Sequence, residues 1–230
     1  MAHPTFPIGK KNKLMTENIE AIVLGYTKFG ENSVVVHTLS KAYGRKGFMV
    51  KVGKRVPSGM LQPLTLVEMD VTENPRSSLW SAKNLTAQKP LEGIRGNLYK
   101  NTMTLFLAEV LLRAVHDGET EDGLYDWCAR SILTLDALET DFANFPVRFL
   151  VELAGAMGFS PSAEDVAPFA GDKLAALKPF LTTDFSGAML LPLTGSLRNA
   201  LCEVLLQYLG YHTECTLRVK SLAVLRAIYE

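Results

Sequence analysis

The sequence has little of what would place it in several large protein classes. Its 230 residues include only three cysteines, at Cys128, Cys202 and Cys215, which excludes a disulfide scaffold and fits a reducing cytoplasm. No apolar run approaches the roughly 20 residues of a membrane-spanning helix, and no apolar segment follows the N-terminal lysines as in a signal peptide. With 47% hydrophobic residues and no net charge, the chain is expected to fold rather than stay disordered.

Catalytic patterns are missing as well. The four histidines are scattered and show neither the H-E-x-x-H pattern nor the His and Cys spacing of a zinc site. Gly25 and Gly30 have the spacing of a phosphate-binding loop, but Glu31 stands where that loop needs its lysine. We therefore expect no enzyme, no catalytic residues, no metal and no cofactor.

Charge is present but unevenly distributed. Residues 1–90 carry 13 Lys and Arg against 6 Asp and Glu, whereas residues 91–230 carry 11 against 18. A basic front half favours a polyanionic partner. The alternative is that two halves of opposite sign simply attract each other.

The pattern over residues 16–88 is short and β-like. Runs such as Ser33–Leu39 and Gly47–Val52 are rich in β-branched and apolar residues, and glycine-containing turns separate them. Five such strands without helical crossovers predict a small closed or nearly closed barrel. Residues 1–15, which lack any period, are expected to be a flexible leader.

After Pro90 the apolar residues recur at helical spacing. We expect an all-α domain over residues 91–230, with helices at about 98–115, 122–138, 145–157, 195–209 and 217–228. Residues 159–195 contain four prolines and are expected to be an irregular insertion with at most one short helix. The fold class is therefore α+β, a barrel followed by a helical domain.

The barrel has the features of a single-strand nucleic-acid binder, which needs a positive groove for phosphates and flat side chains for bases. The segment from Lys41 to Arg55 contains no acidic residue, and the curvature of a barrel can gather its cations along one groove. The alternative for the lysines is a solvated strand edge, and for the aromatic residues it is core or turn packing. The candidate DNA-binding residues are Lys28, Lys41, Arg45, Lys46, Lys51, Lys54 and Arg55, and the stacking candidates are Tyr26, Phe29 and Tyr43.

Several short motifs occur in a characteristic order. The opening segments are Glu20-Ala-Ile-Val-Leu24, Phe29-Gly-Glu31, Val36-His-Thr-Leu-Ser40 and Tyr43-Gly-Arg-Lys46, followed by Gly53-Lys-Arg55, Ser58 and Leu61-Gln-Pro63. Further on come Phe149-Leu-Val-Glu-Leu153 with Gly158-Phe159, Asp184-Phe-Ser-Gly187 and Leu217-Arg-Val-Lys-Ser221. In order and spacing this series resembles the RecO family of recombination-repair mediators.

The resemblance implies an N-terminal OB-fold, a helical C-terminal domain and a cytoplasmic, nucleoid-associated DNA-binding mediator rather than an enzyme. Such proteins bind single- and double-stranded DNA, anneal complementary strands, and help load recombinase with RecR and the single-strand-binding protein. Many members carry two C-x-x-C pairs before the closing segment, but this chain has no cysteine between Gly158 and Leu201, so metal binding is not carried over. Apolar residues are expected to hold that segment instead, among them Phe169, Phe180, Phe185 and Leu190.

The helical half is expected to receive the acidic tail of the single-strand-binding protein, which ends in an apolar residue. The receiver should be an apolar pocket with an arginine at its rim, and Trp127 with Arg130 is the candidate. Two other functions stay open. One is a protein-interaction adaptor with a basic barrel, and the other is an OB-fold RNA-binding protein, since 2′-hydroxyl contacts decide between DNA and RNA.

Overall fold

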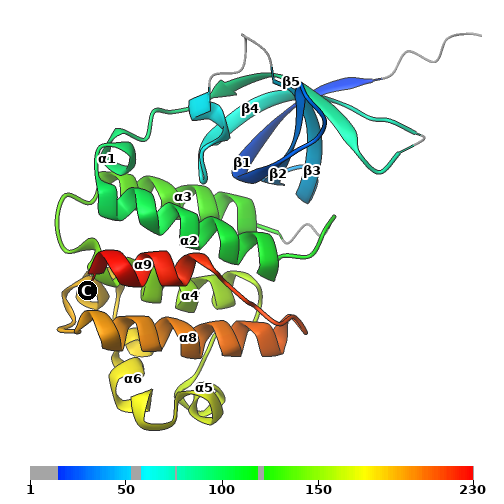
Figure 1. Ribbon diagram of the computed structural model, residues 1–230. Coiled ribbons are helices and arrows are strands. Elements are labelled where there is room, and N and C mark those ends of the chain that lie inside the picture. Colours follow the sequence, from blue (N-terminus) through cyan, green and yellow to red (C-terminus); the bar gives the residue numbers. More distant parts are fainter. Residues whose placement is uncertain (1–14, 53–57, 76, 119–121, 230) are drawn as a thin grey trace, which may run out of the picture.

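The fold is a barrel of strands set on stacked helices (Figure 1). The computed structural model describes residues 15–52, 58–75, 77–118 and 122–229. The strands close in the order β1-β2-β3-β5-β4, and neighbours are antiparallel apart from the parallel pair β3 and β5. This is a five-stranded barrel of the OB type, so the expected fold class is confirmed. The strands are β1 (Thr16–Lys28), β2 (Ser33–Ser40), β3 (Gly44–Lys51), β4 (Leu66–Thr72) and β5 (Trp80–Ala87).

Alternation along the strands sends one set of side chains into the barrel and the other outward. On β3, Phe48 and Val50 are buried in the barrel core, while Met49 between them is half-buried on the outer surface. On β2, Val36 faces Phe48 from inside and Val35 lies beside Met49 outside. The β2–β3 pair therefore has an outer face that is partly open to solvent.

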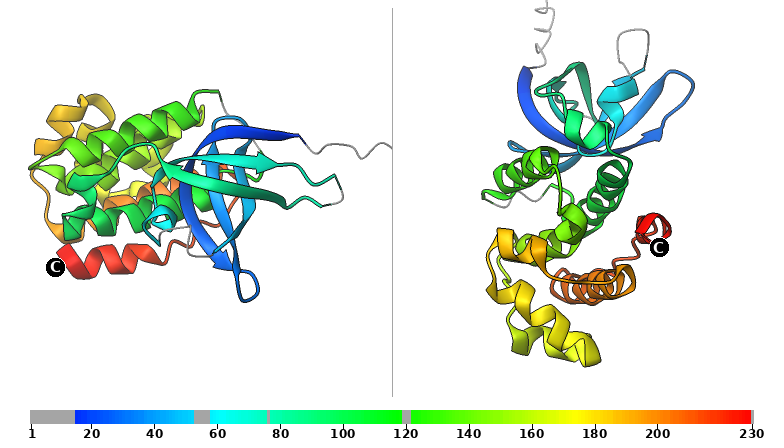
Figure 2. Two further views of the ribbon diagram at one scale, coloured as in Figure 1. Left: turned by 90° about the horizontal axis from the view of Figure 1, so that it is seen from above. Right: turned by 90° about the vertical axis from the view of Figure 1, so that its left-hand side faces the viewer.

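Strand β1 is long because it serves two partners. Its first half pairs with β4 from Thr16 to Ile22, and its second half pairs with β2 as far as Lys28. A shift of register between Val23 and Gly25 bends the strand between these two roles. The end of the β1–β2 hairpin consequently projects beyond the barrel, on the side of the molecule where α9 lies (Figure 2).

The helices begin where the sequence pattern changes. Those expected near residues 98, 122, 145, 195 and 217 are present as α2, α3, α4, α8 and α9. Side-chain caps fix two of the starts, because Asn97 accepts from the Lys100 amide and Thr194 accepts from the Leu197 amide. The helices are α1 (Glu92–Arg95), α2 (Leu98–Ala114), α3 (Leu124–Ala137), α4 (Phe145–Ala156), α5 (Ala163–Ala170), α6 (Leu174–Thr182), α7 (Phe185–Leu190), α8 (Gly195–His212) and α9 (Ser221–Tyr229).

The segment 159–195 is more regular than its prolines suggested. It contains α5, α6 and α7, and the expectation of an irregular insertion with at most one short helix is wrong. Pro168 and Pro179 lie inside α5 and α6, which are only 8 and 9 residues long, so each ring removes one hydrogen bond without breaking a longer helix. A capping box between Ser162 and Asp165 starts α5, and Asp184 caps α7.

Apolar packing holds this segment, which has neither cysteine nor histidine and so does not fit a zinc site. Phe180 is fully buried, as expected, while Phe169 and Phe185 are half-buried against the helical core. Leu190, expected to pack there too, is 68% exposed, because it ends the short helix α7 on its outer side. Leu177 supplies buried surface in its place.

A continuous hydrophobic seam joins the barrel to the helices. Outward-facing Ile22, Leu24, Leu39 and Leu66 are buried in the same core cluster as α2 and α3, and not in the barrel's own core. Helices α2 and α3 lie directly under the barrel (Figure 1). The Arg95 guanidinium adds hydrogen bonds of 2.8 Å and 3.0 Å to the Pro63 carbonyl and the Thr65 hydroxyl.

Candidate nucleic-acid and partner interfaces

The outer face of β2 and β3 is shallow and half-buried. We define the β2–β3 face by Thr27, Val35, His37, Gly47 and Met49, which the registers place side by side. The Thr27 hydroxyl and His37 Nε2 lie 3.0 Å apart in a hydrogen bond. A Cβ on Gly47 would lie 3.1 Å from a Val35 methyl, so the glycine keeps the centre of the face low. In OB-folds this face and the loops beside it receive oligonucleotides.

The His37 side chain is uncharged at this position. Partial burial and the nearby positive charge of Arg45 lower the pKa of His37 below its usual value. The imidazole is therefore neutral at physiological pH and serves as a hydrogen-bonding group of the face.

Two aromatic side chains and two lysines lie at the hairpin end of β1, β2 and β3, next to this face. Tyr26 and Phe29 are each 52% exposed on the projecting β1–β2 hairpin. Lys28 pairs in register with Val34, which points into the barrel, and Lys51 pairs with the adjacent Ser33, which points outward. Both lysines therefore lie at the hairpin end, but on opposite faces of the strands. Neither lysine has an acidic partner within the part of the chain that the structure describes. We call Tyr26, Lys28, Phe29 and Lys51 the hairpin-end cluster.

Lys41 and Arg45 lie at the opposite end and face the helices. The Lys41 ammonium is 2.9 Å from an Asp126 carboxylate oxygen, and this hydrogen bond raises the pKa of Lys41. Arg45 lies 3.9 Å from Asp117, whose neighbour Gly118 donates to the Arg45 carbonyl. The start and end of β3 are separated by roughly 23 Å, at about 3.3 Å per residue.

The expected single groove is therefore divided. The structure places Lys28 and Lys51 at the hairpin end, on opposite faces of the strands, and Lys41 and Arg45 at the other end, where their charges are matched by carboxylates from the helical half. Lys54 and Arg55, which follow β3, lie outside the described residues.

Lys46 and Tyr43 belong to a third group, at the end of the barrel where β3 and β5 begin. The Lys46 ammonium lies 3.9 Å from the centroid of the Trp80 ring, and Tyr43 meets the same ring edge-on at 5.0 Å. The Tyr43 hydroxyl donates to a Glu17 carboxylate, and this hydrogen bond raises the pKa of Tyr43 to about 12. We call Glu17, Tyr43, Lys46 and Trp80 the Trp80 cluster. Trp80 is not among the candidate residues predicted from the sequence, although an aromatic residue directly after a loop is a usable signal.

The two residues proposed for the partner site line one pocket. Trp127 and Arg130, one turn apart on α3, border a cavity of about 310 Å³ between α3, α4 and α7. Its wall is aromatic, since Phe149 packs 5.0 Å from Trp127 between ring centroids and Phe145 lies 6.2 Å from Phe149. Arg130 is exposed at the rim and has no ion pair within the described residues.

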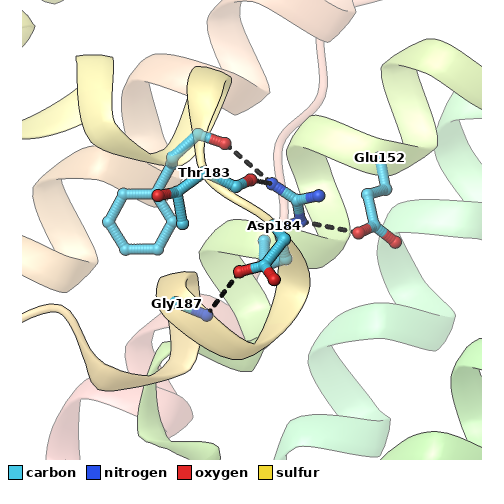
Figure 3. Close-up of polar contacts among 6 residues, drawn as sticks. Glu152, Thr183, Asp184 and Gly187 are labelled. Carbon is cyan, nitrogen blue, oxygen red and sulfur yellow. Dashed lines mark hydrogen bonds and ion pairs between the residues drawn. The ribbon is translucent and has the colours of Figure 1, made fainter.

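A second arginine near this pocket has a structural task. Arg148 holds Glu152 at 2.6 Å and donates to the Phe180 and Thr183 carbonyls at 2.9 Å each (Figure 3). These carbonyls lie at the C-terminal end of α6, so the guanidinium caps that helix while the Asp184 carboxylate starts the next one. Arg130 is thus left as the cation that can meet a ligand in this pocket.

Groups with catalytic or metal-binding potential are dispersed. Burial raises the pKa of both the Cys128 and the Cys202 thiols, which makes them unreactive core residues. Within the described ranges, no three His, Cys, Asp or Glu side chains come close enough to hold a metal ion. None of the helices described there is both long and apolar enough to cross a membrane.

Comparison with known proteins covers both halves. Residues 15–89 match the family described as Recombination protein O N terminal, and residues 95–167 match Recombination protein O C terminal. The chain is 32% identical to the DNA repair protein RecO of Bacteroides fragilis over 173 residues, which is 74% of this chain and 71% of the relative. It is 27% identical to the DNA repair protein RecO of Christiangramia forsetii over 239 residues, covering 94% of this chain and all of the relative. The chain therefore belongs to the RecO family of DNA repair and recombination proteins.

Proposed function

We propose that the protein binds single- and double-stranded DNA, anneals complementary strands, and assists recombinase loading together with RecR and the single-strand-binding protein. The observation that carries this proposal is the hairpin-end cluster, where exposed Tyr26 and Phe29 lie at the same end of an OB barrel as Lys28 and Lys51. Aromatic faces can stack on bases while ammonium groups meet phosphates. In this proposal the protein acts by binding and positioning, without bond-making chemistry of its own.

The proposed DNA path runs over the β2–β3 face from the hairpin end. Lys28 and Lys51 offer their charges to phosphates, and Lys54 and Arg55 extend the same basic run along the sequence. Lys41 and Arg45 contribute less, because Asp126 and Asp117 already balance them. The footprint proposed here is therefore shorter than the sequence alone indicated.

We assign the two halves different tasks. Residues 16–88 would form the nucleic-acid-binding domain, and residues 91–230 would offer the surface for protein partners. The tail of the single-strand-binding protein would place its terminal apolar side chain among Trp127, Phe145 and Phe149, and its carboxylate on Arg130. A hydrogen-bonded Arg–carboxylate pair suits this geometry.

Salt-dependent DNA binding is the decisive test. Fluorescence anisotropy of a labelled single-stranded oligonucleotide, titrated with the full chain between 50 and 200 mM salt, should show affinity falling steeply with salt. An RNA of the same sequence and a duplex are measured in parallel. Equal or tighter binding of RNA would favour the RNA-binding alternative, and no salt-dependent binding of any nucleic acid would favour the adaptor.

The mediator activity needs its own assay. Complementary oligonucleotides coated with single-strand-binding protein should anneal faster when the chain is added. The same assay with a single-strand-binding protein lacking its acidic tail separates the two tasks. Annealing of naked strands measures the first task without the single-strand-binding protein, whereas annealing of strands coated with the tail-less protein should slow. An identical rate on coated strands with and without the tail would contradict the proposed tail contact.

A further inference from the structure

Trp80 occupies an unusual position for a large aromatic residue. It is the first residue of β5 and directly follows the β4–β5 loop, one of the loops through which OB-folds contact their ligands. It pairs in parallel register with Phe48, so its ring packs at the end of the barrel core. Unlike Phe48, which is fully buried, Trp80 is only half-buried.

The open face of this ring is covered by a lysine. The Lys46 ammonium lies 3.9 Å from the ring centroid, and within the described residues it has no acidic partner. A cation–π contact near the surface is weak, and a lysine stem is flexible. The Lys46 ammonium can therefore move away from the ring without breaking an ion pair.

A second aromatic side chain packs against the Trp80 ring. Tyr43 meets Trp80 edge-on at 5.0 Å, and Tyr43 is in turn fixed by its hydrogen bond to Glu17 on β1. The Tyr43 phenol carries its proton at neutral pH and is the donor in this bond. A stacking base requires an aromatic face with positive charge nearby for the phosphates, and Trp80 with Lys46 supplies both once the ammonium moves aside.

We propose that Trp80 is a base-stacking residue and that Lys46 covers it only in the free protein. On binding, a nucleobase takes the ring face and the Lys46 ammonium moves to a neighbouring phosphate, so the cation exchanges one electron-rich partner for another. The inference rests on the proposed DNA binding, and it adds a second contact region to the hairpin-end cluster. The ligand class is single-stranded nucleic acid, since the bases of a duplex are already stacked.

Intrinsic fluorescence tests this directly, because the chain has only two tryptophans, Trp80 and Trp127. In a Trp127→Phe variant the remaining signal is that of Trp80, and an unlabelled oligothymidylate should quench it. In the matched Trp80→Phe variant the signal is that of Trp127, which should not respond. An abasic oligonucleotide of the same length supplies the phosphates without bases and should leave the Trp80 signal unquenched.

Affinity and its salt dependence separate stacking from a merely structural role. Trp80→Leu should weaken oligothymidylate binding about tenfold at every salt concentration without changing the slope of log K against log salt. Lys46→Gln should reduce that slope by about 0.7, the value for one phosphate contact on a single strand. Thermal unfolding confirms that both variants fold, and Trp80→Phe should retain most of the affinity.

The possible failures are distinguishable. Tight binding by anisotropy with an unchanged Trp80 signal would overturn the stacking assignment and leave the proposed function intact. Equal quenching by the abasic strand would also overturn it, since displacement of Lys46 by phosphate would then explain the signal. Absence of binding by anisotropy would overturn the proposed function and this inference with it.

Discussion

Asn144 and Arg198 are joined side chain to side chain across the helical half. The Arg198 Nε donates to the Asn144 Oδ1 at 3.0 Å, and the Asn144 amide nitrogen donates to the carbonyls of Ala188, Met189 and Leu191 at 2.8 to 3.2 Å. Asn144 is 2% exposed. One buried amide thus ties the end of α7 to α8.

Replacing Asn144 should be costly. Asn144→Ala leaves buried carbonyls without donors, and we expect a loss of about 3 kcal/mol in the free energy of unfolding. Asn144→Asp keeps the size but cannot donate from an ionised carboxylate, so it should destabilise as well. Urea unfolding followed by circular dichroism measures both variants. A loss below about 0.5 kcal/mol for Asn144→Ala would show that water replaces the amide.

Attachment of the last helix should depend on pH. The Glu109 carboxylate accepts from the Ser221 amide at 2.8 Å and from its hydroxyl at 2.6 Å, which ties the start of α9 to α2. Burial alone would raise the pKa of Glu109, but these bonds, with those from Lys220 and Arg113, lower it. A lowered carboxyl pKa means stability that is present above the unfolded value of about 4.3 and lost as pH falls through the folded one.

Hydrogen exchange of the α9 amides measures that attachment. Protection of residues 221–229 should fall on acidification below about pH 4.5 faster than protection of α8. Glu109→Gln should lower α9 protection at neutral pH and abolish its extra loss in acid. If α8 and α9 of the wild-type protein lost protection together as the pH falls, Glu109 would not act locally on α9.

The two ends of β3 should differ in their contribution to DNA binding. Lys28→Ala combined with Lys51→Ala should reduce the salt slope for single strands by about 1.4, because two phosphate contacts are lost. Lys41→Ala should change it little, since Asp126 already balances that charge at 2.9 Å. Lys178→Ala, an exposed lysine on the distant α6, is the control. An effect of Lys41→Ala as large as that of the double variant would restore the single groove expected from the sequence.

The Trp127 pocket should recognise a chain end. Calorimetry with the tail peptide should show roughly a tenfold weaker affinity for Arg130→Ala, which removes one charge-assisted hydrogen bond. A tail peptide with an amidated C-terminus should bind the wild-type protein about tenfold more weakly as well. The decisive measurement combines both changes. The Arg130→Ala variant should bind the free-acid and the amidated peptide with the same affinity. If it still distinguishes the two peptides, the carboxylate binds elsewhere.

The strands and most helices could be predicted because their signals are local. The run of β-branched residues at Val34–Val36 and the helical spacing after Leu98 depend only on neighbours in sequence. That Trp127 and Arg130 lie close together could be predicted for the same reason, since they are one turn apart on α3. The helices over 163–190 contradict the prediction because Pro168 and Pro179 are tolerated inside short helices, the first of which begins at the Ser162 cap.

Charge partners and ring contacts could not be predicted from local signals. The carboxylates that balance Arg45 and Lys41 come from Asp117 and Asp126, beyond the end of the barrel in sequence. Trp80 acquires its neighbours only because β5 pairs in parallel with β3, which brings Lys46 over its ring. A basic run in the sequence therefore predicted a charged surface but not where that surface is interrupted.

The hydrophobic seam of Ile22, Leu24, Leu39 and Leu66 has a consequence for how the two halves can cooperate. With a flexible linker, a bound protein tail and a bound DNA strand would change position relative to each other. This seam instead fixes the Trp127 pocket and the β2–β3 face at one separation. Under the proposed function, a single-strand-binding protein held by its tail would keep its own DNA at high effective concentration beside the barrel. Transfer of the strand would then proceed within one assembly and would not depend on the dilution of DNA in solution.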